Sequence, residues 1–395
     1  MNTTTTLALV ANTRMPSQRA QALQVAQMSA AFARAGATTH LFVAARRRRV
    51  ELPPGQDAFD WYGVPAGPRP KLHAVPCVDW IERLPRLLQY VPARLQEQSF
   101  SRNAARAIRR DVTDAWVISR EIETALHLVK RGQRDVFLEI HRVPGGRLRR
   151  RWLLAAASRV RGIVAISGGV RDDLVRLGVP PGSITVEHDA FEPGRFAASP
   201  TKDAARRSLD LPRGVPIVVY TGGLLSWKGV DLLVEAAREL PDVYVAIAGG
   251  MDADVAALRQ RAGGLVNVRI DGFQPPDRVA TYLAAADVGV VPNRSKPEIS
   301  ARYTSPLKVF EAMAAGLPLV ASDVPSLREL LVDREDAVLV RPDDALALRE
   351  GLRALIADDA LRARLAARMR ERSVAHTWDA RAARLLRWMR ERTRA

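Results

Sequence analysis

SPLKVFEAMAAGLPLVAS, residues 305–322, combines the signals of a helix, a turn and a buried strand. Ser305 and Pro306 indicate a helix start, because a hydroxyl can cap the first amides and proline lacks an amide hydrogen that would stay unpaired there. Gly316, with a proline two residues further on, indicates the helix end. The apolar run at 319–321 is typical of a buried parallel strand. The stretch therefore predicts a loop, a helix, a turn and a strand of a parallel sheet.

Lys308 and Glu311 lie three residues apart near the start of this predicted helix. In one interpretation they form an ordinary ion pair on a solvent-facing helix surface, since charges at this spacing commonly pair. In the other interpretation they meet a ligand that the free amides and the positive dipole end of the helix attract. The stretch alone leaves both interpretations open.

The chain of 395 residues is too long for one ordinary hydrophobic core, so we expect two domains. Two successive series of alternating strands and helices predict an α/β protein with a doubly wound parallel sheet in each half. We expect an amino-terminal domain over residues 1–195 and a carboxyl-terminal domain over 196–375, with a cleft between them. A last helix at about 376–395 is expected to pack back on the first domain.

The formal net charge of +17 favours an anionic partner. Only six of the 60 basic residues are lysines, and an arginine excess with many alanines is typical of a GC-rich coding sequence. Part of the charge therefore carries no functional message. The few lysines of such a chain, Lys228 and Lys308 among them, are therefore more informative than its arginines, because a compact ammonium and a planar guanidinium are not interchangeable.

The sequence contains no run of 18 apolar residues, a single cysteine, Cys77, and no basic leader at its start. These features argue against a membrane-spanning helix, an internal disulfide, a cysteine metal cluster and a secretory signal. We expect a cytoplasmic protein.

The amino-terminal half opens with a strand at 6–11, a loop, a helix from Ser17 to about Ala35 with Ser17 as its cap, and a strand at 39–43. Ligands of doubly wound sheets bind beyond the carboxyl ends of the strands, so the loop at 12–19 is a candidate site. The loop lacks GxGxxG, which argues against a dinucleotide-binding oxidoreductase.

Two basic segments of this half leave a further pair of interpretations open. Residues 81–110 carry seven arginines among leucines and aromatic residues, and residues 147–161 carry six arginines around Trp152 without an acidic residue. They are either helices with solvated charges that cover the sheet, or a surface for an anionic membrane or acceptor.

Residues 221–229, TGGLLSWKG, join a predicted strand to a predicted helix. Glycines there let backbone amides approach a phosphate, and Lys228 adds positive charge. The stretch is not a P-loop, because GxxxxGK[ST] is absent, and a plain glycine turn with a surface lysine remains the alternative. Together with Ser305–Gly316, it predicts two helix starts and two lysines around one diphosphate, which needs no metal. We find no metal-ligand spacing among the six histidines.

His141 ends the predicted strand at 135–141 and precedes a glycine loop that would face the cleft. A lone histidine at such a place is either structural or part of a site. Glu139, two residues earlier, alternates with the apolar residues Leu138 and Ile140, and we interpret it as a support for the loop.

The chain resembles the retaining nucleotide-sugar glycosyltransferases of the GT-B fold, family 4 (glycosyl transferases group 1). The resemblance runs over nearly the whole length and is strongest at 215–331. It is carried by TGGLLSWKG, GFQPPDRVATYLAAADVGVVPN and SPLKVFEAMAAGLPLVASDVPSLREL. In the first half, RMPSQRAQALQVAQMSAAF resembles the family's acceptor-side loop, FLEIH the strand that delivers an active-site histidine, and ITVEHDAFEPGRF the hinge.

The resemblance implies a set of site residues. His141, Lys228 and Glu311 would be the catalytic residues: His141 would contact the donor sugar or the charge near its anomeric carbon, Lys228 the diphosphate, and Glu311 the ribose. Ser17 and Arg19 would lie on the acceptor side. The donor would be bound by Gly222, Gly223, Lys228, Ser305, Pro306, Leu307, Lys308 and Glu311.

The sequence departs from the family pattern at two positions. Tyr303 stands where the first glutamate of the family's paired-glutamate motif is expected, and Gly223 where a basic residue is usual. Glu298 is a candidate substitute for the missing carboxylate. Both departures concern the sugar and phosphate side of the donor.

We therefore expect a hexosyltransferase-type enzyme (class EC 2.4) without a cofactor or metal. It would move a sugar from a nucleotide-sugar donor to a saccharide or lipid-linked acceptor in polysaccharide or glycoconjugate synthesis, with possible contact to the inner face of an anionic membrane. The alternatives are a nucleotide-sugar epimerase of the same fold, a basic nucleic-acid-binding protein and a non-catalytic binding protein. No aromatic-interleaved recognition motif favours nucleic acid.

Overall fold

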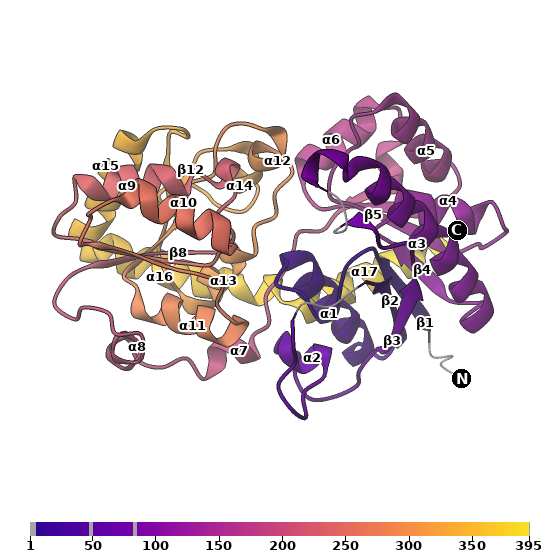
Figure 1. Cartoon of the computed structure of the whole chain (residues 1–395), viewed down its shortest axis with the longest axis horizontal. Helices are drawn as coiled ribbons and strands as arrows, with labels where there is room; N and C mark the ends of the chain where they lie inside the picture. The colour runs from indigo at the N-terminus through magenta and orange to yellow at the C-terminus, as the bar shows by residue number, and fades with distance from the viewer. Residues whose placement is uncertain (1–4, 47–49, 82–84, 395) are drawn as a thin grey trace. The chain divides into compact units, whose positions relative to one another are not determined.

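The computed structural model describes residues 5–46, 50–81 and 85–394, which form two units on separate parallel sheets (Figure 1). Unit 1 takes in the described residues up to Ile166, then Val170–His188 and the described residues from Trp378 on. Unit 2 consists of Ser167–Gly169 and Asp189–Thr377. Residues 1–4, 47–49, 82–84 and 395 of the expected segments lie outside the described residues. The predicted doubly wound parallel α/β class is confirmed.

Unit 1 is built on seven parallel strands in the order β3-β2-β1-β4-β5-β6-β7. The strands are β1 (Thr6–Ala11), β2 (Thr38–Ala45), β3 (Lys71–Pro76), β4 (Trp116–Ser119), β5 (Val136–Ile140), β6 (Gly162–Ala165) and β7 (Ile184–Val186). The sequence did not predict β3, an edge strand whose residues are mostly exposed or half-exposed and which lacks the apolar run that marks its neighbours.

Helices connect the successive strands of unit 1, as parallel pairing requires, and one further helix returns to this unit at the carboxyl terminus. They are α1 (Ala20–Arg34), α2 (Ala58–Trp61), η2 (Arg86–Leu88), α3 (Tyr90–Asp111), α4 (Ile122–Val129), α5 (Arg147–Ala157), α6 (Gly168–Arg176), η3 (Pro181–Ser183) and the carboxyl-terminal α17 (Trp378–Arg394).

Unit 2 has six parallel strands in the order β10-β9-β8-β11-β12-β13. The strands are β8 (Ile217–Thr221), β9 (Tyr244–Ala248), β10 (Val268–Asp271), β11 (Val288–Val291), β12 (Leu319–Ser322) and β13 (Val338–Val340). The helices are α7 (Gly194–Ala197), α8 (Lys202–Ser208), η4 (Ser226–Lys228), α9 (Val230–Arg238), α10 (Asp252–Ala262), α11 (Pro276–Ala285), α12 (Glu298–Ala301), α13 (Leu307–Ala315), α14 (Pro325–Arg328), α15 (Ala345–Ala357), α16 (Asp359–Ser373) and η5 (Val374–His376).

Each sheet reverses its strand order once, between β1 and β4 in unit 1 and between β8 and β11 in unit 2. At such a switch point the loops after the two central strands diverge to opposite faces of the sheet and leave room for a ligand at the carboxyl ends. In unit 2 these loops are the TGGLLSWKG stretch and the segment that leads from β11 to α13.

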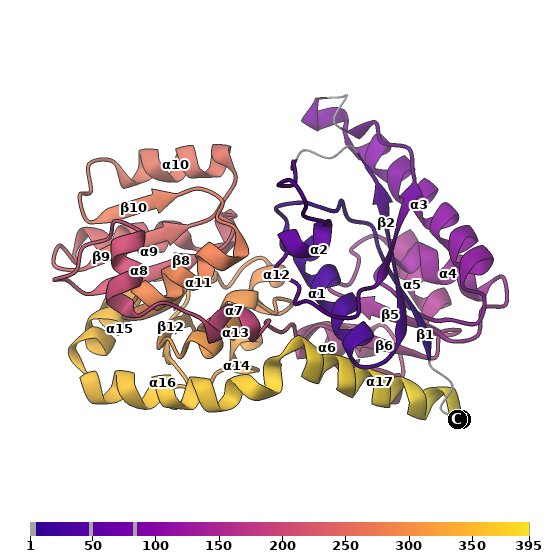
Figure 2. The ribbon, with the colours of Figure 1, turned by 90° about the horizontal axis from the view of Figure 1, so that it is seen from below.

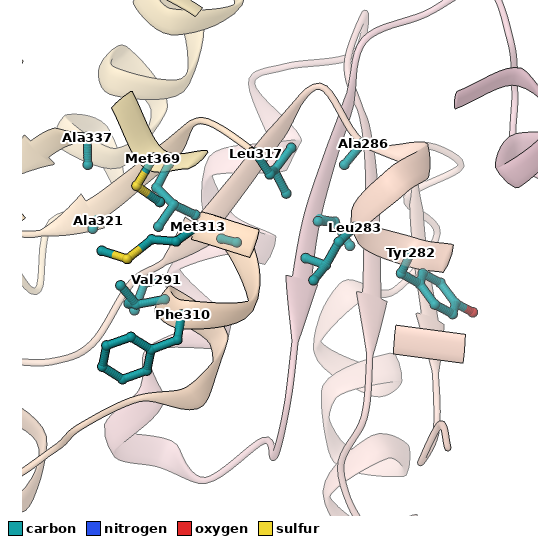
Figure 3. Packing of buried hydrophobic residues seen from close by; sticks show 14 of the residues in the cluster. Tyr282, Leu283, Ala286, Val291, Phe310, Met313, Leu317, Ala321, Ala337 and Met369 are labelled. Carbon is teal, nitrogen blue, oxygen red and sulfur yellow. The ribbon is translucent and has the colours of Figure 1, made fainter. Parts of the chain in front are cut away.

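The apolar face of α13 fixes the position of its first turn at this edge. Phe310 and Met313 are fully buried and belong to one cluster with Val291, Ala321 and Met369 (Figure 3). The predicted helix end is also observed, because Gly316 adopts a left-handed conformation with φ 61°.

The helix α17 packs beside α1 within unit 1 (Figure 2). Trp378 and Leu385 are buried, and the ring of Trp388 lies 5.5 Å from that of Phe137. Only glycine fits at position 162, because a Cβ there would lie 2.5 Å from the Trp388 ring.

The two predicted hydroxyl caps are wrong. Helix α1 begins at Ala20 and α13 at Leu307, and neither has a side-chain cap. The Ser17 hydroxyl accepts from the Arg19 amide at 3.1 Å, before the helix begins, and the Ser305 hydroxyl accepts from the Asp189 amide at 2.7 Å. Both serines are used to hold loops.

None of the helices in the described part of the chain has the length and apolar character needed to cross a bilayer.

Replacing Phe310 by Ala should lower the free energy of unfolding by about 3–5 kcal/mol, because it leaves a cavity beneath α13. Urea unfolding followed by circular dichroism measures the change. Val266→Ala, at a residue that is 95% exposed, is the control and should cost less than about 0.5 kcal/mol. Equal effects of the two substitutions would contradict the assignment of Phe310 to the core.

Candidate anion-binding site

The turn after β8 brings its backbone unusually close to the turn after β9. Gly222 has φ 122°, and its amide donates to the Ala248 carbonyl at 2.9 Å. A Cβ on Gly249 would lie 2.3 Å from the Gly222 carbonyl oxygen, so only glycine fits there. These contacts hold Gly222 and Gly223 at the carboxyl edge of the sheet, with η4 directly behind them.

Two lysines flank this glycine turn. A Cβ placed on Gly222 would lie 3.5 Å from the Lys308 Nζ, and one placed on Gly223 would lie 3.6 Å from the Lys228 Nζ. Lys228 ends η4, and Lys308 lies in the first turn of α13. The predicted convergence of these two lysines on the TGG turn is thus present in the geometry.

The Lys308 ammonium is buried against an aromatic ring. Its Nζ lies 3.6 Å from the centroid of the Tyr220 ring, and Lys308 is only 9% exposed. Among the described residues the Nζ has no hydrogen-bond partner. Burial, and then the charge of Lys228, hold the pKa of Lys308 well below the usual lysine value. A buried donor of this kind is costly without an acceptor, and an anion would supply one.

Lys228 has a similar but weaker perturbation. Burial lowers the pKa of Lys228 to about 8, and its Nζ lies 5.3 Å from the centroid of the Trp227 ring. An anion close to the two lysines would favour their charged forms and so raise both pKa values.

The side chain of Tyr220 contacts both Lys308, through its ring, and the glycine turn, through its hydroxyl. Its side chain is fully buried, and its hydroxyl donates to the Gly223 carbonyl at 2.7 Å. Burial raises the pKa of Tyr220, so the hydroxyl remains a donor. Sequence reasoning took this residue for an ordinary strand position.

Glu311 does not pair with Lys308. Its Oε1 lies 3.4 Å from Nη1 of Arg195, which α7 supplies from 116 positions away. Burial raises the pKa of Glu311 although Arg195 and Lys308 oppose that shift. The surface ion pair at 308 and 311 is therefore excluded, and Arg195 is a site residue that sequence reasoning missed.

The segment Ser305–Leu307 is held by backbone and loop contacts. Asp189 donates its amide to the buried Ser305 hydroxyl, and Pro306 occupies the cap position of α13. Because no side chain caps this helix, the first amides of Leu307 and Lys308 are available to an anion.

Tyr303 is buried and donates its hydroxyl to Glu298 Oε2 at 2.9 Å. Glu298 is exposed and also lies 3.4 Å from Nη1 of Arg302. The tyrosine at the position of the expected glutamate is thus joined to a carboxylate five residues earlier.

In unit 1, His141 belongs to a chain of polar contacts. Its Nε2 lies 2.7 Å from Glu139 Oε1, and its Nδ1 lies 3.2 Å from Nη2 of Arg120. Burial first, and then the charge of Arg120, lower the pKa of His141 to about 4. The ring is therefore neutral at physiological pH, and both of its nitrogens are engaged.

The two acceptor-side candidates differ in environment. Ser17 is buried, and its amide and carbonyl both contact the Tyr62 hydroxyl, at 2.6 and 2.9 Å. Arg19 is exposed at the start of α1. Both lie in unit 1 with His141, whereas the donor-side candidates lie in unit 2.

Glu121 is a further polar residue at the switch point of unit 1. Its Oε1 accepts from the Asn12 amide at 3.0 Å, which joins the loops after β1 and β4. Burial raises the pKa of Glu121 to about 7, and the carboxylate of Glu123 adds to the shift. A carboxyl group with this pKa exchanges its proton near neutral pH.

The residues that the structure describes contain no group of three or more histidine, cysteine, aspartate or glutamate side chains placed to hold a metal ion.

Comparison with known proteins agrees with this geometry. Residues 201–372, most of unit 2, match the model of the family described as "Glycosyl transferases group 1". A D-inositol 3-phosphate glycosyltransferase of Xylanimonas cellulosilytica is 34% identical over 259 residues, which make up 62% of this chain and 59% of that protein. The chain thus spans about six tenths of the length of this curated relative.

Solved structures share the architecture of the whole chain. Sucrose-phosphate synthase of Thermosynechococcus elongatus has a TM-score of 0.77 at 21% identity, with 98% of both chains covered. HepE of Anabaena in complex with UDP-glucose has a TM-score of 0.71 at 15% identity, with 96% of this chain and 99% of that chain covered. The two parallel-sheet units therefore share the GT-B fold of these structures, and residues 201–372 of the second unit are similar to the group 1 family model.

The lowered lysine pKa values predict that anion binding weakens in alkali. Below pH 8 Lys228 is mostly protonated, so its attraction for an anion is complete; as the pH rises through 8 the free protein loses this charge. The affinity for inorganic pyrophosphate should fall about tenfold between pH 7 and 9.5, measured by titration calorimetry. The affinity of the Lys228→Arg variant should fall less over the same pH range, because a guanidinium keeps its charge. An affinity of the wild type that does not change with pH would refute the assignment.

Proposed function

We propose that the chain is a retaining glycosyltransferase of family 4, which moves a sugar from a nucleotide diphosphate donor to an acceptor hydroxyl. The observation that carries the proposal is the buried Lys308 ammonium, without a hydrogen-bond partner in the described chain, beside Lys228 and the glycine turn. A diphosphate supplies the two adjacent anionic groups that such a pair of cations can bind.

In this proposal, different residues bind different parts of the nucleotide sugar. Lys228, Lys308 and the first amides of α13 bind the diphosphate, together with the backbone of Gly222 and Gly223. These groups stabilise the negative charge that grows on the diphosphate as it leaves the sugar. Glu311, held by Arg195, accepts hydrogen bonds from the ribose hydroxyls. The Tyr303 and Glu298 pair faces the sugar in this assignment.

The complex of HepE with UDP-glucose supports a hexose donor. The Xylanimonas relative is named a D-inositol 3-phosphate glycosyltransferase. On unit 1 we assign His141 to the sugar end of the donor and Ser17 and Arg19 to the acceptor, a saccharide or lipid-linked saccharide of polysaccharide or glycoconjugate synthesis.

The first experiment identifies the donor. In a thermal-shift screen against UDP-, GDP-, ADP- and TDP-sugars, the sugars of one base should raise the melting temperature of the protein. ¹H NMR should then show that the product has the same anomeric configuration as the donor. Release of a modified sugar without any acceptor would instead identify an epimerase. Binding of duplex DNA at 0.15 M salt, with no response to any nucleotide sugar, would refute the proposal.

Lys228→Ala should lower kcat/KM by about 100-fold or more, because it removes a charge that acts on the leaving diphosphate. Circular dichroism should be unchanged, since the side chain is not part of the core. Lys130→Ala, at an exposed lysine of unit 1, is the control and should retain full turnover. Near-normal turnover of Lys228→Ala would remove this residue from the donor site.

We also propose that unit 1 contacts an anionic membrane surface from the cytoplasmic side, where a lipid-linked acceptor would lie. Exposed apolar side chains gather before and within the first turns of α3 and on α5; they are Trp80, Leu87, Leu88, Tyr90, Val91, Leu95, Leu148 and Leu154. Exposed arginines accompany them on and beside α5; they are Arg142, Arg147, Arg150 and Arg151. Apolar groups ringed by cations fit the interface of an anionic bilayer.

The starts of α3, α4 and α5 are linked by ion pairs, so these apolar residues belong to one region. Arg149 lies 3.7 Å from Glu97 and 3.4 Å from Glu123, and Arg94 also lies 3.4 Å from Glu123. The region follows the carboxyl ends of β3 and β5, the edge where the acceptor candidates lie.

Replacing both Leu87 and Tyr90 by Ser should weaken binding to phosphatidylglycerol vesicles about tenfold or more, because both side chains are at least three-quarters exposed and available for insertion. Vesicle sedimentation measures the change. Val266→Ser, at an equally exposed apolar residue of unit 2, should bind like the wild type. Binding that is absent from the wild type, or equal in the double variant, would refute the membrane contact.

A further inference from the structure

The carboxyl-terminal helix α17 sends a fully buried arginine into unit 1. Arg381 is 1% exposed and is the largest of the completely buried side chains in the described residues. Its Nε donates to the His188 carbonyl at 2.8 Å, Nη1 lies 3.0 Å from the Met28 sulfur, and Nη2 lies 3.1 Å from Glu139 Oε2. A buried guanidinium is tolerated only where its donors are used, and all three nitrogens here have acceptors.

Glu139 joins this arginine to His141. One carboxylate oxygen accepts from Arg381, and the other lies 2.7 Å from the His141 Nε2 and 3.6 Å from Nε of Arg120. Burial alone would raise the pKa of Glu139, but Arg381, His141 and Arg120 together hold it well below the usual carboxyl value. The group is therefore a carboxylate, which only accepts hydrogen bonds.

This chain of contacts defines the tautomer of His141. The guanidinium of Arg120 can only donate, so the His141 Nδ1 that lies 3.2 Å from it is an acceptor. The carboxylate of Glu139 can only accept, so Nε2 carries the proton. His141 is thus held as the neutral Nε2–H imidazole. Arg120 donates directly to its Nδ1, and Arg381 acts at its Nε2 through the carboxylate of Glu139.

We propose that Arg381 is a positioning residue, which holds the orientation and the Nε2–H tautomer of His141 through Glu139. The side chain comes from the far end of the sequence, 242 positions from Glu139. Arg381 also contacts the carbonyls of Glu187 and His188, the last residues before the chain leaves unit 1. Helix α17 therefore supplies a part of the site and does not only cover the sheet.

The catalytic consequence rests on the proposed function, whereas the effect on the histidine does not. If His141 contacts the sugar, loosening its ring should lower kcat about 10- to 100-fold. The KM for the donor should change little, because the diphosphate-binding residues lie in unit 2.

The test compares two arginines of α17 by long-range ¹H–¹⁵N spectra of ¹⁵N-histidine-labelled protein. The His141 signals are those that His141→Asn removes, and the wild type should show the Nε2–H tautomer with a pKa of about 4. Arg381→Gln should raise that pKa by about one pH unit and introduce the second tautomer, because a nearby cation and the anchor of Glu139 are lost. Arg384→Gln, which removes the ion pair with the Glu187 carboxylate and leaves Arg381 and Glu139 in place, should leave the spectrum unchanged.

A second variant covers the case in which Arg381→Gln does not fold. Glu139→Ala removes the acceptor itself, so it should release the tautomer of His141 while Arg381 remains. An unchanged His141 spectrum in Arg381→Gln, or in Glu139→Ala if only that variant folds, would overturn the inference whatever the activity. Absence of glycosyl transfer with every donor, with the histidine spectra as expected, would overturn the proposed function alone.

Discussion

The buried ammonium of Lys308 is the constraint around which unit 2 is arranged. A charge removed from water costs free energy unless other groups replace the water. The Tyr220 ring supplies part of that replacement, while Lys228 adds repulsion. An anion would supply the acceptor that the Lys308 Nζ lacks among the described residues. The position of the site follows from the parallel sheet, whose strand order reverses between β8 and β11 and so brings the glycine turn and the start of α13 to one edge.

At the carboxyl edge of its own sheet, unit 1 has buried charges that are paired, in contrast to the cation of unit 2 that is unpaired among the described residues. There the buried charges are matched within the protein: Glu139 lies between Arg120, His141 and Arg381. A matched network fixes geometry, and an unmatched cation attracts a ligand. The first unit thus presents a preorganised neutral histidine, and the second presents charge that an incoming diphosphate would neutralise.

The departures from the family pattern also have a physical reading. Tyr303 contacts Glu298, so a carboxylate remains near the position of the missing glutamate, although it comes from α12 and is exposed. Gly223 leaves room beside Lys228, where a basic side chain is usual in the family. In the proposed donor site, Lys228 and Lys308 would serve the phosphate side, and Tyr303 with Glu298 the sugar side.

The sequence by itself determined what local chemistry controls: the α/β class, the helix and strand of residues 305–322 with the Gly316 stop, and the two lysines beside a glycine turn. On Ser17 and Ser305 it was wrong only in predicting that their hydroxyls cap helices, because a hydroxyl caps a helix only if the path of the loop directs it to the first amides. Only the tertiary structure decided that Arg195 meets Glu311 across 116 positions and Arg381 meets Glu139 across 242. Such pairs depend on how strands close into sheets, and local sequence patterns carry no information about that closure.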